Sequence, residues 1–582
     1  MKTIKENSRG LFNLDIDFSK FLIIIAVVIG TAGGLFAVFF QMMIGWANQG
    51  FHGASRSLFG FLPGNWWLVV VPSLAGIIVG PLVYFFAREA KGHGVPEVME
   101  AVALKGGRMR MRVIFVKAIA SASSIGAGAS VGREGPIVQM GSGIGSVMGQ
   151  RFKLNEEKIK TCVACGAAAG ISATFNAPIA GVLFAQEVIL GRFASATFIP
   201  IVISSVTASV IAQMFMGDVP AFFVHAYSLN HPLELILYSL LGVLAAISAV
   251  LFVKVLYKTE DIIDEVKILP EWSKPVFGGI VIGMIGLKFP QILGVGYETI
   301  EAVFRGEILL ITLIALVFVK IIATSLTLGS GFSGGVFAPS LFIGATLGGA
   351  FGLIVQQVFP GISIDSGAYA IVGMGAVVAG ATQAPITAIL IIFEMTRDYR
   401  IILPLMIAVV FSTLIFSYLS KDSIYTKKLS RRGVNLHLGK DINIMKRIRV
   451  KEVMSSPVEV VQDTDKVGDV IKKMHNSKHN GFPVMNLAGE LTGIIALHDI
   501  REAPVKGIME MPVLSLMNRK LIVTNPDETL DDVFKKLGLH EIGHLPVVAG
   551  DNPKKLLGII TRSDIVKAYD KKLLTTKEIE TA

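Results

Sequence analysis

An acidic side chain stands at the start of one of the most apolar stretches of the chain. Residues Val131–Met140 read VGREGPIVQM, in which Glu134 follows Arg133 between two glycines. Gly and Pro are expected where a helix begins at a crowded site, and a helix N-terminus exposes unpaired N–H groups that attract anions. A carboxylate there competes with an anion when ionised and releases the site when protonated. The stretch therefore predicts an anion site with Glu134 as gate and proton acceptor.

Composition indicates a membrane protein. The 582 residues are 52% hydrophobic and 17% charged, with 60 glycines and a mean hydropathy of +0.63, beyond the range of soluble globular proteins. Seven uncharged runs approach or exceed the roughly 20 residues that span a bilayer: Phe21–Ser55, Ser57–Ala87, Thr161–Gln186, Phe193–Gly217, Leu235–Val253, Ile321–Ile364 and Ile401–Ser420. Ionisable groups are costly in such runs, so an Arg133–Glu134 pair that merely ends a helix is the weaker interpretation.

Gly and Pro interrupt several of these runs. Breaks are expected within Ser73–Phe86, Ala173–Phe184 and Ala381–Phe393. Backbone that leaves the helix at membrane depth is tolerated only where it is buried in protein or lines a cavity. The pattern favours a solute pathway over a bundle of simple spanning helices.

The apolar part contains an internal repeat. NAPIAGVLFAQE (Asn176–Glu187) recurs as QAPITAILIIFE (Gln383–Glu394), with the prolines 207 residues apart (385 minus 178). GREGP (Gly132–Pro136) is matched by GVFAP (Gly335–Pro339), 203 residues later (335 minus 132). Packing of small residues alone explains neither pair, so two halves of similar plan are predicted.

Charged residues become frequent after Lys421, which indicates a soluble tail. Within it, Arg449–Arg501 and Leu516–Ala568 share an order of strand and helix signals, and predict two small α/β modules packed on one another. The basic runs Lys105–Arg112 and Lys427–Arg432 are expected in the cytoplasm. Because they flank membrane segments, nucleic-acid binding is not expected.

Four segments together resemble the anion-pathway signatures of the CLC family of chloride channels and proton-coupled chloride antiporters. They are GHGVPEV (Gly92–Val98), GREGP, GGVFAP (Gly334–Pro339) and DSIYTKKL (Asp422–Leu429). The tail resembles a tandem pair of cystathionine-β-synthase (CBS) domains. The resemblance implies an all-α polytopic membrane domain with an inverted internal repeat, followed by α/β tandem CBS domains.

The expected domain organisation follows from this resemblance. It comprises a cytoplasmic N-terminal segment (1–20), a CLC-like anion-transport domain (21–429), a linker (430–448), CBS domains at 449–505 and 511–572, and a C-terminal tail (573–582). A homodimer with one anion pathway per subunit is implied, as a multi-pass protein of the cell (inner) membrane with its N-terminus and CBS tail in the cytoplasm.

The resemblance also implies which residues line the anion pathway: His93, Gly132, Arg133, Gly135, Val336, Phe337, Ala338 and Tyr425. Residues 336–338 would bind through backbone N–H groups, and Tyr425 through its hydroxyl, a good neutral donor. Arg133 has a second interpretation, as a partner of an acid or a backbone carbonyl. Tyr425 has one too, as an aromatic of the membrane interface.

His93 departs from the family pattern, which usually has a serine between those glycines. A neutral imidazole still donates an N–H, whereas a protonated one would hold the anion more tightly and make transport pH-sensitive, since an unperturbed His titrates near pH ~6.5. Alternatively the side chain turns away and the anion selectivity differs. Chloride or another small anion is the expected bound ion.

Val188 is a second departure. Proton-coupled members have a relay glutamate directly after the position of Glu187, and valine carries no proton. The sequence therefore favours a passive chloride channel gated by Glu134 and modulated by the CBS tail. A proton-coupled chloride antiporter of the same fold is the alternative.

The tail contains one predicted ligand site. Thr561 and Asp564 look like the hydroxyl and carboxylate that hold an adenosine ribose (ATP, ADP or AMP) in nucleotide-binding CBS pairs, whereas the first repeat has Ala496 with Asp499. A purely structural or dimerising role is an equal alternative.

An enzyme is the remaining alternative. Gly331–Gly334 reads GFSG, as in rhomboid serine proteases, with His93 as the conceivable base. A catalyst needs a Ser–His hydrogen bond and an oxyanion hole, but GFSG runs straight into the repeated GVFAP, so no enzyme is predicted. Cys162 and Cys165 are expected to be buried thiols. No metal and no required cofactor are predicted.

Overall fold

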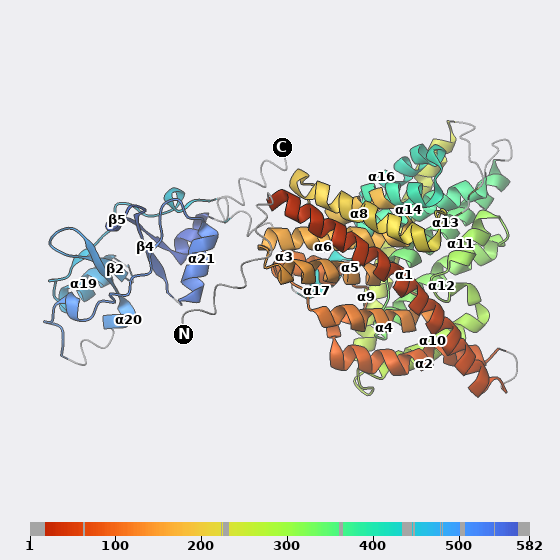
Figure 1. Ribbon diagram of the computed structural model, residues 1–582, viewed down its shortest axis with the longest axis horizontal. Helices are drawn as coiled ribbons and strands as arrows, with labels where there is room; N and C mark the ends of the chain where they lie inside the picture. The colour runs from red at the N-terminus through yellow and green to blue at the C-terminus, as the bar shows by residue number, and fades with distance from the viewer. Residues whose placement is uncertain are drawn as a thin grey trace, which may run out of the picture. The chain divides into compact units, whose positions relative to one another are not determined.

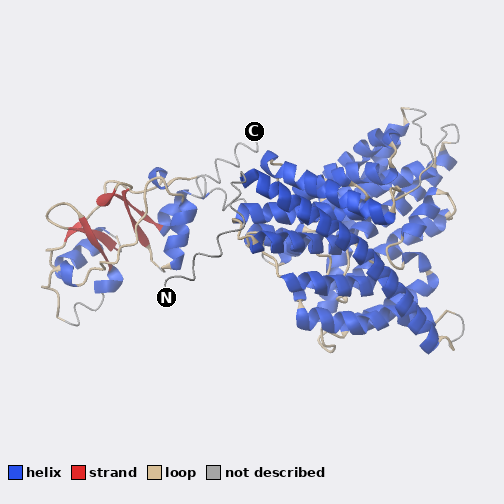
Figure 2. Ribbon diagram, in the orientation of Figure 1, coloured by secondary structure: helices blue, strands red, loops and turns tan. Residues whose placement is uncertain are grey.

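The computed structural model describes residues 18–61, 65–222, 224, 232–359, 365–432, 445, 448–477, 479, 481–500, 507–540 and 542–568. Most of the predicted N-terminal segment and linker, and the whole predicted C-terminal tail, lie outside these residues. Contacts divide the chain into two compact units, Met1–Val434 and Asn435–Ala582. Among the described residues, strands occur only in the second unit (Figure 2).

The first unit is built from two series of helices with the same order (Figure 1). The first series is α1 (Phe18–Phe59), α2 (Trp67–Pro81), α3 (Val95–Leu104), α4 (Met111–Gly126), α5 (Glu134–Arg151), α6 (Glu156–Phe175), α7 (Pro178–Phe184) and α8 (Ser195–Met216). The second is α9 (Glu234–Glu265), α10 (Lys274–Lys288), α11 (Tyr297–Phe304), α12 (Leu310–Gly329), α13 (Phe337–Val358), α14 (Ser366–Thr382), α15 (Pro385–Thr396) and α16 (Ile402–Leu419). A short α17 (Thr426–Arg431) follows.

Two of the three predicted breaks are confirmed. In each repeat the helix ends at a residue with a left-handed backbone, Asn176 (φ 54°) or Gln383 (φ 57°), and a new helix begins at the proline two positions later. The third prediction, within Ser73–Phe86, is wrong. There α2 runs through Pro81 into a π-helical turn, Leu82–Phe86, because a proline near a helix end removes only one N–H and the widened turn accommodates its ring.

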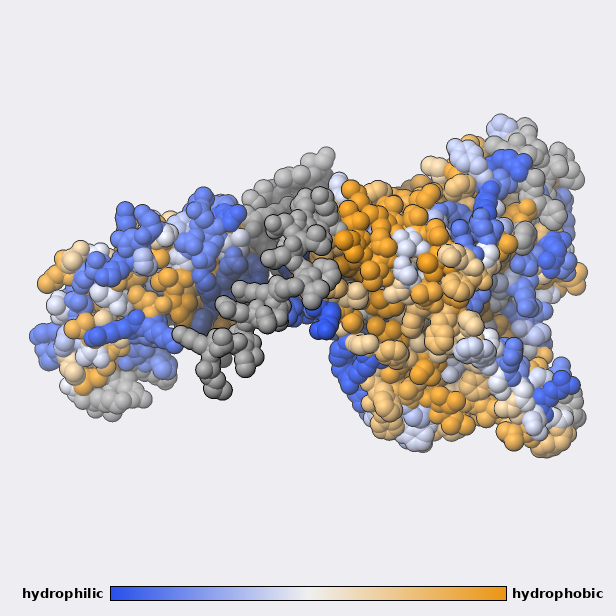
Figure 3. Space-filling model, in the orientation of Figure 1, coloured by the Kyte–Doolittle hydropathy of each residue, from blue (hydrophilic) through white to orange (hydrophobic). Residues whose placement is uncertain are grey.

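Within the part of the chain that the structure describes, seven helical segments are long and apolar enough to cross a membrane. The surface over α1 and α8 is apolar (Figure 3). On these helices Ile24, Phe39, Phe198 and Val210 are all more than 40% exposed. Such a surface is unfavourable in water, whereas in a bilayer its apolar side chains contact the apolar lipid chains. The predicted run Ile321–Ile364 is divided, because a Gly-rich loop separates α12 from α13.

Glycines allow the helices inside the first unit to touch through their backbones. A Cβ on Gly166 of α6 would lie 1.9 Å from the carbonyl oxygen of Gly141 on α5, and one on Gly344 of α13 would lie 2.3 Å from that of Gly373 on α14. The same close pairing occurs in both series, as is typical of small residues in membrane helices. Cys162 and Cys165 are buried, unpaired thiols on α6, as predicted.

The second unit contains two modules of similar plan. The first has β1 (Val461–Gln462), α19 (Val467–Ser477), β2 (Gly481–Met485), β3 (Leu491–Ala496) and α20 (Leu497–Ile500), with strand order β1-β2-β3. The second has α21 (Leu530–Leu539), β4 (His544–Ala549) and β5 (Asn552–Thr561), with β4 antiparallel to β5.

The two modules exchange backbone contacts. Ser455, which precedes β1 in the first module, pairs with Ile559 of β5, and Asn518, which precedes α21 in the second, pairs with Ile494 of β3. Each module therefore bonds a strand of the other through its backbone, which confirms the prediction that they pack together.

Candidate functional site

Three loops from distant parts of the sequence meet in the centre of the first unit. Gly92 pairs with Ser333, and Gly132 pairs with Gly335 through two hydrogen bonds of 2.8 and 2.6 Å. The latter pair joins the loops that precede α5 and α13, which are the two GxxxP motifs of the repeat. The chain thereby brings three predicted segments together: GHGVP, GREGP and GGVFAP.

Glu134 is the first residue of α5 and is only 1% exposed. Its Oε2 accepts the N–H of Ala338, in the first turn of α13, at 3.3 Å. Its Oε1 accepts the hydroxyl of Tyr297, the first residue of α11, at 2.9 Å. The carboxylate of one repeat thus lies at the helix N-termini of the other, where partial positive charge favours an anion.

Two glycines make this arrangement possible. A Cβ on Gly132 would lie 2.2 Å from Oε2 of Glu134, so any side chain would displace the carboxylate. A Cβ on Gly135 would lie 2.1 Å from the carbonyl oxygen of His93. The N–H of Gly132 already donates to Gly335, so its contribution to the site is the space that it leaves.

Arg133 is the N-cap residue of α5, and its side chain contacts Gln41 and Tyr297. Its Nη1 donates to Oε1 of Gln41 at 3.0 Å, and its guanidinium lies 5.4 Å from the ring centre of Tyr297. The arginine therefore orients the same tyrosine that bonds Glu134. Its partners are an amide and an aromatic ring, in place of the acid or carbonyl that the sequence suggested.

The other predicted pathway residues are buried around these loops. Val336 is the N-cap of α13, and Phe337 begins the helix with its ring 5.7 Å from that of Phe175. His93 is 3% exposed, and its ring lies 6.1 Å from that of Tyr425. Tyr425 is 2% exposed, so it is not an aromatic of the membrane interface.

Two buried lysines support equivalent loops, and sequence reasoning missed them. Lys117 of α4 donates to the carbonyls of Ala90 and Gly92, at 3.0 and 2.6 Å. Lys320 of α12 donates to Ile292 and Gly294, at 2.9 and 3.1 Å. The signal was present: IFVKAIAS (114–121) and VFVKIIAT (317–324) align at the same 203-residue offset as the GxxxP motifs.

The repeated glutamates of NAPIAGVLFAQE and QAPITAILIIFE cap each other's helices. Glu187 accepts the N–H groups of Ile386 and Thr387, at 3.2 and 2.8 Å, at the start of α15. Glu394 accepts those of Ile179 and Ala180, at 2.9 and 2.7 Å, at the start of α7. Both acids therefore stabilise the contact between the two repeats at the starts of α7 and α15. Val188, next to Glu187, is buried among apolar side chains.

The hydroxyl of Ser333 is bonded within the scaffold. It donates to the carbonyl of Ala90 at 2.8 Å and lies 2.9 Å from the hydroxyl of Ser121. The Nε2 of His93 instead contacts Tyr257. The Ser–His pair that a serine protease requires is therefore not formed by these two residues.

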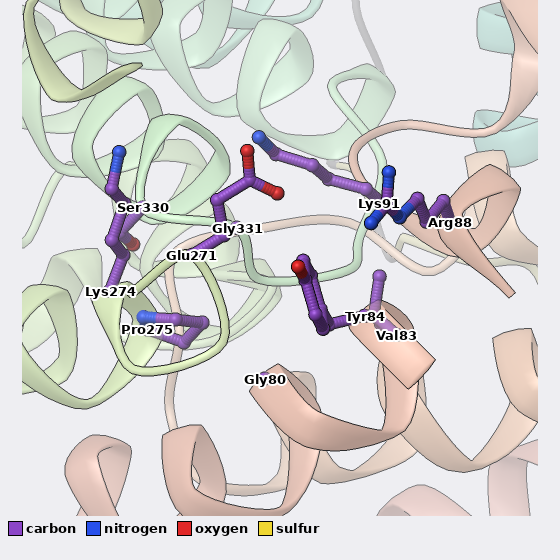
Figure 4. A pocket seen from close by; sticks show the side chains of 10 residues that line it. All are labelled: Gly80, Val83, Tyr84, Arg88, Lys91, Glu271, Lys274, Pro275, Ser330 and Gly331. Carbon is purple, nitrogen blue, oxygen red and sulfur yellow. The ribbon is translucent and has the colours of Figure 1, made fainter. Parts of the chain in front are cut away.

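Figure 4 shows a cavity between α2 and α10, lined by Gly80, Val83, Tyr84, Arg88, Lys91, Glu271, Lys274, Pro275, Ser330 and Gly331. Lys91 and Glu271 reach into it from opposite sides. None of the residues predicted to bind an anion lines this cavity. The converging loops, and not this cavity, therefore form the candidate site.

In the tail, Thr561 and Asp564 contact each other. The N–H and hydroxyl of Thr561 both donate to Oδ2 of Asp564, at 2.9 and 2.8 Å, where β5 ends and a helix begins. In the first module the N–H of Ala496 bonds Asp499 in the same way. This is a helix cap, which explains the repeated aspartate structurally.

The fold and site define a class: a membrane protein of two repeats whose helix N-termini meet at a buried carboxylate, suited to passing anions. A sequence model of the family described as "Voltage gated chloride channel" matches residues 75–417, and that of the CBS domain matches 450–506 and 513–571. The chain therefore belongs to the CLC family of voltage-gated chloride channels and carries two CBS domains. Proteins of this family are channels or transporters, not enzymes.

Several relatives are similar over most of their length. A protein of Ralstonia nicotianae (strain ATCC BAA-1114 / GMI1000), whose name describes it as a ClcB-like chloride channel protein, is 32% identical over 70% of this chain and 97% of its own. The H(+)/Cl(-) exchange transporter ClcA of Klebsiella pneumoniae (strain 342) is 33% identical over 70% and 88%.

Among solved structures, that of a slow cyanobacterial Cl−/H+ antiporter is 28% identical over 71% of this chain and 97% of its own, with a TM-score of 0.65. The predicted family, fold class and anion transport are confirmed. The preference for a passive channel is not, because relatives named as exchangers fit at least as well.

Proposed function

We propose that this protein exchanges chloride for protons across a cell membrane, with Glu134 as both gate and proton carrier. One observation carries the proposal: the Glu134 carboxylate accepts the N–H of Ala338 at the start of α13. An anion bound at that N–H group would have to replace the carboxylate. Two negative charges repel each other at such a distance, so a protonated Glu134 leaves the site more readily.

Coupling follows from this competition. If Glu134 vacates the anion position mainly when protonated, each opening for an anion involves a proton. The similarity to exchangers in bacteria and to a solved antiporter supports this reading. The expectation of a passive channel is therefore the second candidate.

Passive conduction retains one specific observation in its favour. Val188 is buried in apolar surroundings, and its neighbour Glu187 is fully engaged at the start of α15. Neither residue is placed to carry a proton toward Glu134. A protein in which protons reach Glu134 from one side only would conduct chloride without exchange.

The remaining parts of the proposal concern ligands, assembly and location. Chloride is the proposed ion, with residues 336–338, His93 and Tyr425 as its surroundings. We place the protein as a homodimer in the cell (inner) membrane, with its N-terminus and CBS tail in the cytoplasm. The tail would modulate transport and bind an adenine nucleotide at Thr561 and Asp564.

Chloride efflux from liposomes containing the purified protein tests the gate. Glu134→Gln removes the negative charge but keeps the shape, so chloride flux is expected to rise at neutral pH and to lose the part of its pH dependence that comes from protonation of the gate. Glu307→Gln is the matched control, because Glu307 is an exposed acid paired with Arg305 after α11. A Glu134→Gln protein whose flux keeps the wild-type pH dependence would refute the gating role.

A further inference from the structure

The hydrogen bonds around His93 determine which ring nitrogen carries its proton. Nε2 lies 3.3 Å from the hydroxyl oxygen of Tyr257, on α9. That hydroxyl donates its one proton to the carbonyl of Ile424, at 2.6 Å. Since a carbonyl only accepts, the Tyr257 oxygen is the acceptor in its contact with His93. Neutral His93 therefore carries its proton on Nε2.

The other nitrogen is then a bare acceptor. Nδ1 of His93 is buried and has no hydrogen-bond partner among the residues that the structure describes. A lone pair repels an anion, whereas an added proton would turn Nδ1 into a charged N–H donor. The serine usual in this family position offers a hydroxyl donor at any pH. His93 can offer an equivalent donor at Nδ1 only after binding a proton.

The charges around His93 decide when that proton binds. The titratable groups facing the ring are Glu97 on α3, Lys117 on α4, Tyr257 on α9, Tyr425 before α17, and Lys428 and Arg432 on or next to α17. Glu134 on α5 acts on Tyr425. Lys428 and Arg432 both bind Oε1 of Glu97, at 2.7 and 3.3 Å, and Lys117 bonds Gly92.

The cations outnumber the free acidic charge beside the ring. Lys117, Lys428 and Arg432 are offset by Glu97 and by Glu100, which pairs with Arg432 at 3.5 Å, whereas Glu134 is held by Tyr297 and Ala338. This excess opposes a further positive charge on the imidazole while the pathway is empty. An anion bound next to the ring supplies the missing negative charge, so proton and anion favour each other.

We propose that His93 is a second proton-binding site, in which a proton on Nδ1 and an anion beside the ring bind together. The inference rests on the proposed anion transport and adds a form of pH regulation to it. By thermodynamic linkage, the factor by which the proton strengthens anion binding equals the factor by which the anion strengthens proton binding. The anion affinity of this position rises as the pH falls.

The test separates His93 from the gate by using the full-length protein with Glu134→Gln. Calorimetric titration with sodium chloride, repeated in buffers of different ionisation enthalpy between pH 5.5 and 7.5, counts the protons taken up per chloride. We expect uptake that approaches one proton, with chloride affinity rising toward tenfold per pH unit where His93 titrates. Glu134→Gln combined with His93→Gln should take up none and should bind chloride with the same affinity at every pH.

Two further variants keep the test decisive. His93→Ser, the residue usual in the family, should also abolish proton uptake, which guards against a fault in folding of the glutamine variant. Tyr257→Phe removes the group that fixes the tautomer, so proton uptake per chloride should fall while chloride binding persists.

The inference is overturned if Glu134→Gln alone takes up no proton, or if uptake survives in both His93 variants. These outcomes do not touch the proposed gate, which is judged by the pH dependence of flux in Glu134→Gln against wild type. Absence of any heat from chloride, with heat from another halide, would instead overturn chloride as the proposed ion.

Discussion

The two halves of the membrane unit each hold an equivalent loop on an equivalent lysine, but the side chains that the two loops carry are different. In the first half, Gly92 and Gly94 adopt positive φ angles of 79° and 85°, above Lys117. In the second, Gly294 and Gly296 do so at 64° and 88°, above Lys320. Only glycine takes up such angles without strain, so the two loops share a backbone conformation that requires glycine at both positions.

The side chains on the loops differ. Between the glycines stand His93 in the first half and Val295 in the second. One position beyond the second glycine, the first half has Val95 and the second has Tyr297, whose hydroxyl bonds Glu134. The scaffold is thus symmetric, whereas each half contributes its own polar group to the pathway.

The largest effect should come from the shared scaffold. Lys117→Met and Lys320→Met each leave two buried carbonyls without a donor, so each should lower the free energy of unfolding in detergent by about 3 kcal/mol. Chemical denaturation of the purified protein measures this. Lys254→Met, at an exposed position of α9, is the control. If only one of the two buried lysines matters, the two halves do not share this support.

The second-largest effect should come from the hydroxyl of Tyr297, which has no counterpart in the first half. Tyr297→Phe removes a donor that stabilises the ionised, site-filling form of Glu134, a loss of about 1.5 kcal/mol. Chloride flux at pH 7 should rise by up to roughly tenfold, and the pH of half-maximal flux should move upward by about one unit. In the Glu134→Gln background the same substitution should change nothing. An equal rise there would mean that Tyr297 acts as a steric plug.

A smaller and symmetric effect is expected from the reciprocal caps. Glu187→Gln and Glu394→Gln each retain one acceptor oxygen and lose the negative charge that strengthens the bonds to two N–H groups at a helix start. Each should therefore cost about 1 kcal/mol of stability. Proton coupling should survive in Glu187→Gln because its carboxylate is used for capping. A loss of coupling at unchanged stability would show that Glu187 carries protons after all.

The smallest expected effect is the pH dependence of the stability of the tail, and it comes from His544 in the second module. Burial lowers the pKa of His544, nearby His479 lowers it further, and Asp564 raises it. The folded tail therefore binds this proton less tightly than the unfolded chain. The contribution of neutral His544 to the free energy of unfolding is therefore fully present above pH ~6.5. It declines as the pH falls, by less than about 1.4 kcal/mol per pH unit. Hydrogen exchange of β4, corrected for intrinsic rates, should show this decline, and His544→Gln should remove it.

Many helix starts and breaks could be predicted because they depend on short local motifs. GREGP and GVFAP predicted the helix starts at Glu134 and Phe337, and the NAP and QAP motifs predicted breaks that depend on a left-handed residue before proline. Long-range partners could not be predicted in this way. Nothing in GVGYE marks Tyr297 as the partner of Glu134, since their contact spans 163 residues and depends on how the repeats fold together.

The missed lysines show a different limit. Lys117 and Lys320 occur in matching segments at the repeat offset, so comparison of the two halves could have found them. A charged residue within an apolar run is itself a sign of function or of a buried partner. The predicted break within Ser73–Phe86 was wrong because a local signal was overread. Its proline lies so near the helix end that a single widened turn accommodates it.

The coupling of the two ions is the most direct test of the account. Liposomes containing the purified protein, with a chloride gradient and no initial pH gradient, are followed with a pH electrode while valinomycin and potassium set the membrane potential. The account predicts proton movement driven uphill by chloride, lost in Glu134→Gln while chloride still flows. Chloride flux with no proton movement in the wild type would contradict exchange and favour a passive channel.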